Sequence, residues 1–470
     1  MKEPKSSNRE IIIITYIFVG IFAGLLFYFG YFIQIDSSNV INNPYNKRQD
    51  LLAERVVRGK ILGNKGEILA ETKTDKEGKE YRFYPYENMF CHVVGRFSNG
   101  KSGVELSENI NLLTSSENPL LAILNEIQGN KNKGDNVVTT LDVTLQKIAY
   151  EALGNRKGAV VALEPETGKI LAMVSKSDYN PNTVSSNWNT LVEDSSGNSP
   201  LLNRGTQGLY PPGSTFKIIT ALEYIRENKE YQDYRYTCKG SDTFEGVKIN
   251  CYNNKIHGKE DLIKSFGKSC NASFSNIGMH LNVKSFRNLC ESFLFNGDLP
   301  TDIPHSKSSF VLDKNSEKKE MPQTAIGQGN TQITPLHNAL ITATIANNGV
   351  MMKPYVVDHL ESYDGSMVKQ YQPSSYAKLM NEKEVKIMKK MMKTVVEDGT
   401  ASALKSSSYT AGGKTGSAEF DSNKSSHAWF VGYAPTKKPK IVVSVIVEGA
   451  GTGSQYAVPI AKKMMDAYLN

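Results

Sequence analysis

The strongest constraint on the fold is an apolar run at residues 11–35, which reads IIIITYIFVGIFAGLLFYFGYFIQI and contains no charged side chain. At about 1.5 Å rise per residue, a helix of this length crosses the ~30 Å hydrocarbon core of a bilayer. A secretory signal is shorter and ends at a small-x-small cleavage site, which the following residues do not offer. We therefore predict a transmembrane helix over residues 11–35, after a short tail at residues 1–10. The alternative is a buried core helix of a soluble protein.

The charges around this run predict its orientation. Three basic residues precede it against two acidic ones, and no basic residue follows before Lys47. The positive-inside rule then places the tail in the cytoplasm and the rest of the chain outside the cell membrane, as a single-pass protein. The net charge of +7 is spread over 470 residues without a clustered basic stripe, so we expect no nucleic-acid partner.

The hydrophobic pattern divides the remaining chain into two parts. Residues 36–150 carry few long apolar runs and are predicted to form an elongated, β-rich pedestal. Residues 151–470 show two β runs, at 159–163 and 169–174, then several helical patterns. Three more strand patterns follow, in AGGKTGSAEF, HAWFVGYAP and KIVVSVIVEG, and a last helix covers 457–468. This order predicts an α+β fold, in which strands from both ends of the domain form a five-stranded antiparallel sheet flanked by helices.

The cysteines and histidines give no sign of a metal site or cofactor. The chain has five cysteines but no C-x-x-C, and its seven histidines show neither H-E-x-x-H nor zinc-ligand spacing with a cysteine. A Cys238–Cys251 disulfide and free, buried thiols both remain open. We therefore predict no cofactor.

A serine and a lysine lie three residues apart in YPPGSTFKIITAL, at positions 214 and 217. Residues at this spacing share one helix face, and the positive end of the helix dipole favours negative charge developing on Ser214. A desolvated Lys217 amine can act as the base that a serine nucleophile needs. The pattern alone indicates only a helix cap with a solvated lysine, because it recurs at Ser265/Lys268, Ser316/Lys319, Ser366/Lys369 and Ser375/Lys378.

Two further motifs follow in order along the chain. KSCNASF contains Ser269 and Asn271, and GGKTGSAEF contains Lys414, Thr415, Gly416 and Ser417. The set S-x-x-K, S-x-N and K-T-G is typical of β-lactamases and penicillin-binding proteins. Taken singly, Ser269 is explained as a helix N-cap, Asn271 as a core amide and Lys414 as a solvated strand lysine.

With these motifs the chain resembles the class B penicillin-binding proteins, which are membrane-anchored peptidoglycan D,D-transpeptidases. The segments VVRGKILGNKGEILAE, TTLDVTLQ, NRGTQGLYPPGSTFK, AIGQGNTQITPL and HAWFVGYAP also resemble family segments, in the usual order. The similarity covers about residues 50–450. Departures are Asn64 and Lys65 in the first segment, Asn180 for the usual aspartate, and Ser417 for the usual threonine after K-T-G.

The resemblance implies a fold like that of serine β-lactamases and a transpeptidase domain at 151–470. It implies acyl transfer on D-Ala-D-Ala stem peptides, with β-lactams as covalent inhibitors. Ser214 would be the nucleophile and Lys217 its base. Ser269 would relay protons, Lys414 would help hold Lys217 neutral, and Asn271 would bind the peptide backbone. Thr415, Gly416 and Ser417 would bind the substrate and its terminal carboxylate. The family also implies a polytopic membrane glycosyltransferase as partner.

Two other functions remain open on this resemblance. One is a β-lactam-hydrolysing or β-lactam-sensing serine enzyme of the same fold, although the chain lacks the deacylating E-x-x-L-N segment and offers only ESFLFN, one residue too long. The other is a catalytically inactive wall-binding scaffold, against which the intact motif residues argue.

Overall fold

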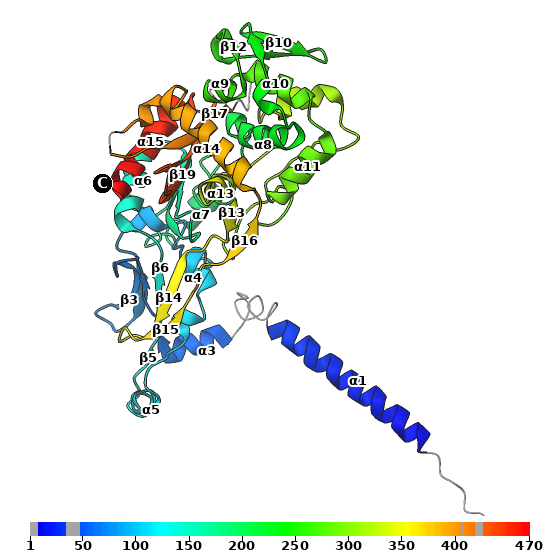
Figure 1. Cartoon of the computed structure of the whole chain (residues 1–470). Coiled ribbons are helices and arrows are strands. Elements are labelled where there is room, and N and C mark those ends of the chain that lie inside the picture. Colours follow the sequence, from blue (N-terminus) through cyan, green and yellow to red (C-terminus); the bar gives the residue numbers. More distant parts are fainter. Residues whose placement is uncertain (1–7, 34–47, 407, 419–425) are drawn as a thin grey trace, which may run out of the picture.

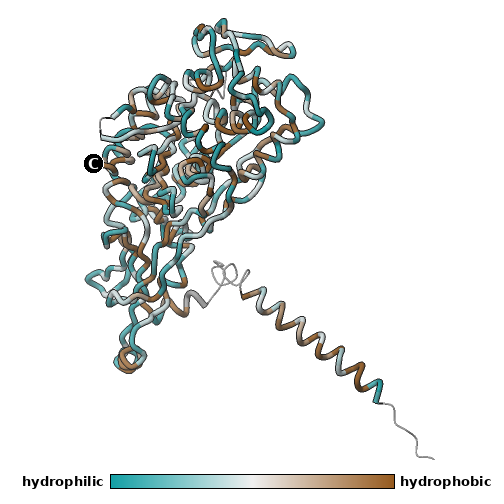
Figure 2. The backbone as a smooth tube through the Cα atoms, in the orientation of Figure 1, coloured by the Kyte–Doolittle hydropathy of each residue, from teal (hydrophilic) through white to brown (hydrophobic). Residues whose placement is uncertain are grey.

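A computed structural model of the chain describes residues 8–33, 48–406, 408–418 and 426–470. Near its start lies helix α1 (Arg9–Tyr31), with a mean hydropathy of 2.5 and no buried residue. Figure 2 shows hydrophobic residues along most of its length. A long, exposed, apolar helix fits a single membrane crossing, and its exposure excludes the alternative of a buried core helix. Residues 1–7 of the predicted tail and 34–35 of the predicted span lie outside the described residues.

The first sheet lies at the lower end of the folded body in Figure 1, below the larger part of the chain. It has six strands, in the order β15 (Met367–Gln370), β14 (Val357–Glu361), β6 (Asn136–Thr139), β2 (Ile61–Leu62), β3 (Ile68–Thr74) and β4 (Glu80–Phe83). Strand β1 (Val56–Val57) pairs with β5 (Asn132–Lys133), and helices α3 (Arg48–Arg55), α4 (Gly103–Ser107) and α5 (Pro119–Ile127) complete this region. The predicted pedestal is therefore β-rich. Its boundary at residue 150 stays a prediction, and the chain returns to this sheet through β14 and β15.

A buried ion network joins elements of this region. Glu105 on α4 is fully buried and accepts hydrogen bonds from Arg58 Nε at 2.8 Å and from Arg82 Nε on β4 at 2.6 Å. Burial alone would raise the pKa of Glu105, but the two guanidinium groups hold it below its ordinary value. A carboxylate in this setting is stable only with both arginines in place.

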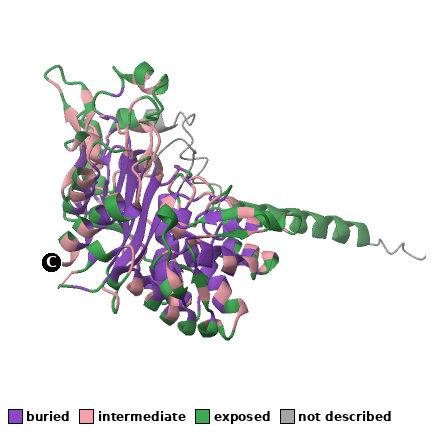
Figure 3. Cartoon of the chain, turned by 90° about the horizontal axis from the view of Figure 1, so that it is seen from above, coloured by how far each residue is buried: buried purple, intermediate pink, exposed green. Residues whose placement is uncertain are grey.

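The second sheet confirms the predicted five-stranded antiparallel arrangement. Its order is β17 (Gly412–Ala418), β18 (His427–Ala434), β19 (Ile441–Val447), β7 (Gly158–Leu163) and β8 (Ile170–Lys176), so strands from both ends of the domain meet at β19 and β7. Every residue of β7, β18 and β19 is buried, as Figure 3 shows for the centre of the molecule. Both faces of the sheet are therefore covered.

Helices cover the two faces of this sheet. Helices α6 (Val143–Leu153) and α15 (Gly453–Leu469) lie on one side in Figure 1, and α13 (Pro335–Ala346) lies on the other. Helix α14 (Glu382–Glu397) packs against β17. Beyond α13 lie α8 (Lys217–Glu227), α9 (Leu262–Gly267), α10 (Asn271–Met279), α11 (Val283–Ser292) and α12 (Met321–Thr324).

Two small sheets stand at the end of the molecule opposite the first sheet (Figure 1). Strand β9 (Tyr236–Cys238) pairs with β12 (Gly258–Glu260), and β10 (Ser241–Phe244) pairs with β11 (Val247–Asn250). They lie beside α9 and α10, so the segment between α8 and α9 forms a separate small lobe next to the motif Ser269–Asn271.

Candidate active site

Ser214 lies in a 3-10 turn (Gly213–Thr215) that leads into α8. The sequence places it on the first turn of the helix, but α8 begins only at Lys217. The helix begins later because of the turn that precedes it. Gly213 adopts φ 53°, and the N–H of Phe216 donates to the carbonyl of Gly213 three residues earlier, as in a 3-10 helix. The turn is held from outside by Trp429, whose Nε1–H donates to the Pro211 carbonyl at 3.1 Å.

Lys217 is fully buried beneath this turn. Its Nζ donates to the Ser269 carbonyl at 2.8 Å and to Asn271 Oδ1 at 2.7 Å, and it lies 3.4 Å from Ser269 Oγ. Burial lowers the pKa of Lys217 to about 8, and the thiols of Cys270 and Cys251 act in the opposite direction. The amine is therefore close to its titration point at neutral pH, as a general base requires.

Lys414 reaches the same hydroxyl from β17. Its Nζ donates to Ser269 Oγ at 2.8 Å and to the Thr415 carbonyl at 3.0 Å, and it is also fully buried. Burial, and then the ammonium of Lys217, lower the pKa of Lys414 well below its usual range. From the sequence, we expected the positive charge of Lys414 to lower the pKa of Lys217. In the structure the like-charge effect acts on Lys414, while burial dominates at Lys217.

Ser269 thus lies between the two amines, two residues before α10 begins. Its φ of 58° is a left-handed conformation that is uncommon for a residue with a side chain. In this conformation the carbonyl of Ser269 accepts a hydrogen bond from Lys217, while the hydroxyl of Ser269 contacts Lys414. The next motif residue, Asn271, donates from Nδ2 to the Asn250 carbonyl at 2.9 Å, so the small lobe contacts the site directly.

The predicted residues surround a cleft of about 850 Å³. Its lining includes Ser214, Ser269, Asn271, Thr415, Gly416 and Ser417, whereas Lys217 and Lys414 lie behind its wall. Strand β17 is the terminal strand of its sheet in the described part of the chain. An extended peptide in the cleft can therefore pair with the main chain of β17. All eight residues selected from the sequence meet at this one place.

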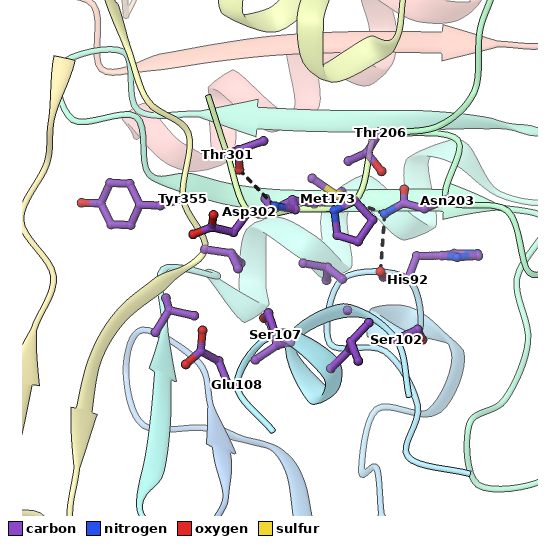
Figure 4. A pocket seen from close by; sticks show the side chains of 18 of the residues that line it. His92, Ser102, Ser107, Glu108, Met173, Asn203, Thr206, Thr301, Asp302 and Tyr355 are labelled. Carbon is purple, nitrogen blue, oxygen red and sulfur yellow. Dashed lines mark hydrogen bonds between the residues drawn. The ribbon is translucent and has the colours of Figure 1, made fainter. Parts of the chain in front are cut away.

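A second cavity of about 610 Å³ lies between the first sheet region and the sheet of β7 and β8 (Figure 4). His92 and Asn203 lie on its wall, and Asn203 Nδ2 donates to the His92 carbonyl at 3.4 Å. Burial lowers the pKa of His92 to about 4, so this imidazole is neutral at pH 7. None of the residues selected from the sequence lines this cavity.

Comparison with known proteins identifies the family. Residues 158–466 match the family model of the penicillin binding protein transpeptidase domain, which is more than half of the chain. The chain belongs to the penicillin-binding protein transpeptidases. Residues 58–137 match the model of the penicillin binding protein A dimerisation domain. The predicted resemblance is confirmed.

Several named penicillin-binding proteins are similar over most of their length. Peptidoglycan D,D-transpeptidase PbpA of Mycolicibacterium smegmatis is 30% identical over 460 residues, covering 91% of this chain and 92% of that protein. MrdA of Haemophilus influenzae, of the same printed activity, is 29% identical and covers 91% and 70%. The ceftriaxone acyl-enzyme of penicillin-binding protein A from M. tuberculosis superposes with a TM-score of 0.81 at 28% identity, over 89% of this chain and 100% of that one.

Some contacts of this penicillin-binding protein were not predicted from its sequence. Asn338 Nδ2 donates to Thr215 Oγ1 at 3.1 Å, and the hydroxyls of Thr400 and Thr415 bond each other. Both bring residues from distant parts of the chain to a motif. No local pattern marks such partners, since only the tertiary fold creates the contact.

The five cysteines are all buried and free. The sequence shows no metal-ligand spacing, but the fold brings together the side-chain sulfur and nitrogen atoms of Cys238, Cys251, His257 and Cys270, all within 4.8 Å of one another. The sequence pattern missed this cluster because its successive members lie 6 to 13 positions apart, at the end of β9, after β11, before β12 and before α10.

Proposed function

We propose that this chain is a peptidoglycan D,D-transpeptidase that cross-links D-Ala-D-Ala stem peptides through an acyl-enzyme on Ser214. β-Lactams would acylate the same serine. The observation that carries the proposal is the meeting of the three motifs: the buried amines of Lys217 and Lys414 both approach the hydroxyl of Ser269, behind the cleft that Ser214 lines. The printed activity of the relatives and the acyl-enzyme neighbour support the same reaction.

Each motif residue receives one role in this reaction. Ser214 Oγ attacks the carbonyl of the penultimate D-Ala, and the neutral Lys217 amine accepts the hydroxyl proton. The tetrahedral oxyanion is stabilised by the backbone N–H groups of Ser214 and Ser417. The peptide bond then breaks, and Ser269, in contact with both amines, relays a proton to the departing D-Ala nitrogen. The amine of a second stem attacks the ester, returns a proton to the base and restores Ser214.

Substrate binding follows from the lining of the cleft. The Asn271 side-chain amide has both a donor and an acceptor for the peptide backbone. The hydroxyls of Thr415 and Ser417 suit the terminal carboxylate, and Gly416 lets β17 pack closely against the turn that carries Ser214. In the structure, Cβ added at Gly416 would lie 3.0 Å from the Trp429 side chain and 3.2 Å from the Pro212 carbonyl.

Fluorescent penicillin tests this proposal. We expect the wild-type chain to be labelled covalently and to release the label slowly, and Ser214→Ala to abolish labelling. Ser366→Ala is the matched control, since Ser366 has the same S-x-x-K spacing but is exposed, away from the cleft. Rapid release of hydrolysed drug would instead indicate a β-lactam-hydrolysing enzyme. Absence of labelling in the wild type would indicate an inactive scaffold.

We also propose that the anchor tail is cytoplasmic and that the catalytic domain lies outside the membrane. The basic tail and the apolar, unburied α1 support this orientation. Protease added to intact protoplasts should then degrade the domain. Protection of the domain in intact protoplasts, with degradation only after lysis, would reverse the assignment.

The partner proposed for the pedestal is a polytopic membrane glycosyltransferase. Support comes from α5, whose apolar side chains are exposed: Leu120, Leu121, Ile123, Leu124 and Ile127. A contiguous exposed apolar surface of this kind is typical of an interaction site. A photo-crosslinking residue at position 124 should couple to the glycosyltransferase, whereas one at the exposed position 397 should not. Equal coupling from both positions would contradict this surface assignment.

A further inference from the structure

The small lobe contains a compact group of sulfur and nitrogen atoms that the transpeptidase reaction does not use. Cys238 ends β9, Cys251 follows β11, His257 precedes β12 and Cys270 precedes α10. We call these four residues the thiol–imidazole cluster. Its ligand atoms all lie within 4.8 Å of one another.

The distances within the cluster match a tetrahedral metal site. Cys251 Sγ lies 3.6 Å from Cys238 Sγ and 3.7 Å from Cys270 Sγ, and Cys238 Sγ lies 3.4 Å from His257 Nδ1. Zinc bonds of about 2.3 Å to sulfur and about 2.0–2.1 Å to nitrogen give tetrahedral edges of about 3.8 Å between sulfurs and about 3.6 Å between sulfur and nitrogen. These three distances therefore match the edges that zinc requires, and the other three among the four atoms are at most 4.8 Å.

Backbone donors support negative charge on the sulfurs. The N–H of Gly240 donates to Cys238 Sγ and the N–H of Ser273 donates to Cys270 Sγ, each at 3.4 Å. Zinc binds cysteine as the thiolate, and hydrogen bonds to ligand atoms orient them and tune the metal. Such donors are an outer-shell feature of metal–thiolate sites.

The lobe lacks a substantial apolar core of its own. Its separate buried cluster consists of Cys238, Cys251, Cys270 and Ala272, with Tyr236 packed partly against it. Two-stranded sheets of this size are at best marginally stable by themselves. A small unit with so little apolar burial usually needs a disulfide or a metal to hold it.

We propose that the thiol–imidazole cluster binds one structural zinc ion. Three cysteines and one histidine are a complete set for a structural zinc site, which leaves no open position for a substrate or water. Binding releases the three thiol protons and uses the neutral imidazole through Nδ1. The metal holds strands β9, β11 and β12 to the start of α10.

This metal also positions catalytic groups. Cys270 lies between Ser269 and Asn271 in the sequence, and Cys251 follows Asn250, whose carbonyl accepts the hydrogen bond of Asn271. Zinc therefore fixes both segments that meet at the Asn271 side chain. Zinc bound to Cys270 also holds the left-handed backbone of the adjacent Ser269 in place.

Metal content is the first test. We expect the full chain, purified in detergent without chelators or a metal-affinity column, to contain about one zinc per chain. Elemental analysis by mass spectrometry should show this zinc, and cobalt substitution should give thiolate-to-cobalt charge-transfer absorption. Zinc at a small fraction of one per chain, after growth with ample zinc, would overturn the proposal.

Matched variants separate the cluster from other thiols. Cys238→Ser and His257→Gln should lose the zinc, whereas Cys91→Ser and Cys290→Ser should retain it. The two control cysteines are equally buried but lie outside the cluster. Retention of zinc in both cluster variants would overturn the assignment of the ligands.

Chelation of the wild type covers the case in which a cluster variant fails to fold. Removing zinc should make three thiols reactive toward a thiol reagent. It should also slow penicillin acylation, by up to about 100-fold, because small displacements of catalytic groups are costly. Added zinc should restore the rate. Unchanged thiol reactivity after chelation would contradict the proposal.

The rival state is a disulfide. Denatured wild-type chain lighter by two hydrogens, with no zinc and with a peptide map that joins Cys251 to Cys238 or Cys270, would overturn the proposal. The metal result does not depend on the proposed catalytic role: Ser214→Ala should still bind zinc, and Cys290→Ser should still be acylated.

Discussion

Two amines with lowered pKa values lie on either side of one serine hydroxyl. Full burial removes Lys217 and Lys414 from water, which disfavours the charged form of each. Both donate to Ser269 or its carbonyl, so the hydrogen bonds are kept while the charged form of each amine is disfavoured. Burial therefore brings the Lys217 amine close to its neutral form, behind the cleft that Ser214 lines.

The first prediction is a pH dependence of acylation. The pKa of Lys217 is lowered to about 8 by burial, and only its neutral form accepts the proton of Ser214. The acylation rate should therefore rise as the pH increases through about 8 and level off above it. Stopped-flow labelling with fluorescent penicillin measures this rate. A rate that does not change across this range would exclude Lys217 as the base.

Lys217→Ala tests the same group by removal. We expect the variant to fold but to be acylated about 10²–10⁴-fold more slowly, the usual contribution of a general base. Lys319→Ala is the control, since Lys319 has the same S-x-x-K spacing but a side chain that is 57% exposed. Circular dichroism checks the fold of both. Normal acylation of Lys217→Ala would contradict the assigned role.

At the scale of elements, the sequence predicted those strands and turns that depend on residues close together in the chain. The strands around Lys414 and the turn at Gly213 follow from their own residues, and the motif order predicted that Ser214, Ser269 and Lys414 would meet. The thiol–imidazole cluster could not be predicted in this way. Its members Cys238 and His257 are separated by 19 residues and become neighbours only when β9 pairs with β12.

A prediction at this scale concerns the buried glutamate on helix α4, Glu105. Glu105→Ala leaves Arg58 and Arg82 buried without their carboxylate partner, which should cost about 3–5 kcal/mol. Hydrogen exchange in β2–β4 should accelerate by at least about 100-fold, because opening becomes that much easier. Since the folded state depresses the pKa of Glu105, its stabilisation is present above the unfolded carboxyl pKa and is lost as the pH falls through the folded one.

Glu397→Ala on α14 is the control for this change. Glu397 pairs with Lys393 at 2.9 Å, but its side chain is 50% exposed, and such surface pairs contribute about 0–1 kcal/mol. Its removal should leave exchange in the first sheet unchanged. Equal acceleration by both variants would show that the effect does not come from the buried network.

For the whole molecule, the apolar helix α1 is predicted to be the membrane attachment. A chain that begins at residue 48 should remain in the supernatant after ultracentrifugation and bind penicillin at the rate of the full chain. The full chain should sediment with membranes. A truncated chain that still sediments with membranes would show that another surface, such as the exposed apolar face of α5, holds it there.

The pairing of β14 with β6 has a consequence for biosynthesis. Asn136 on β6 bonds Glu361 on β14, 225 positions later in the chain. At about 5–20 residues per second, a ribosome needs roughly 10–45 s to deliver that partner. During this interval β6 presents an open strand edge, which is a template for wrong pairing. The nascent chain therefore carries an unpaired edge at β6 until the hairpin of β14 and β15 is made.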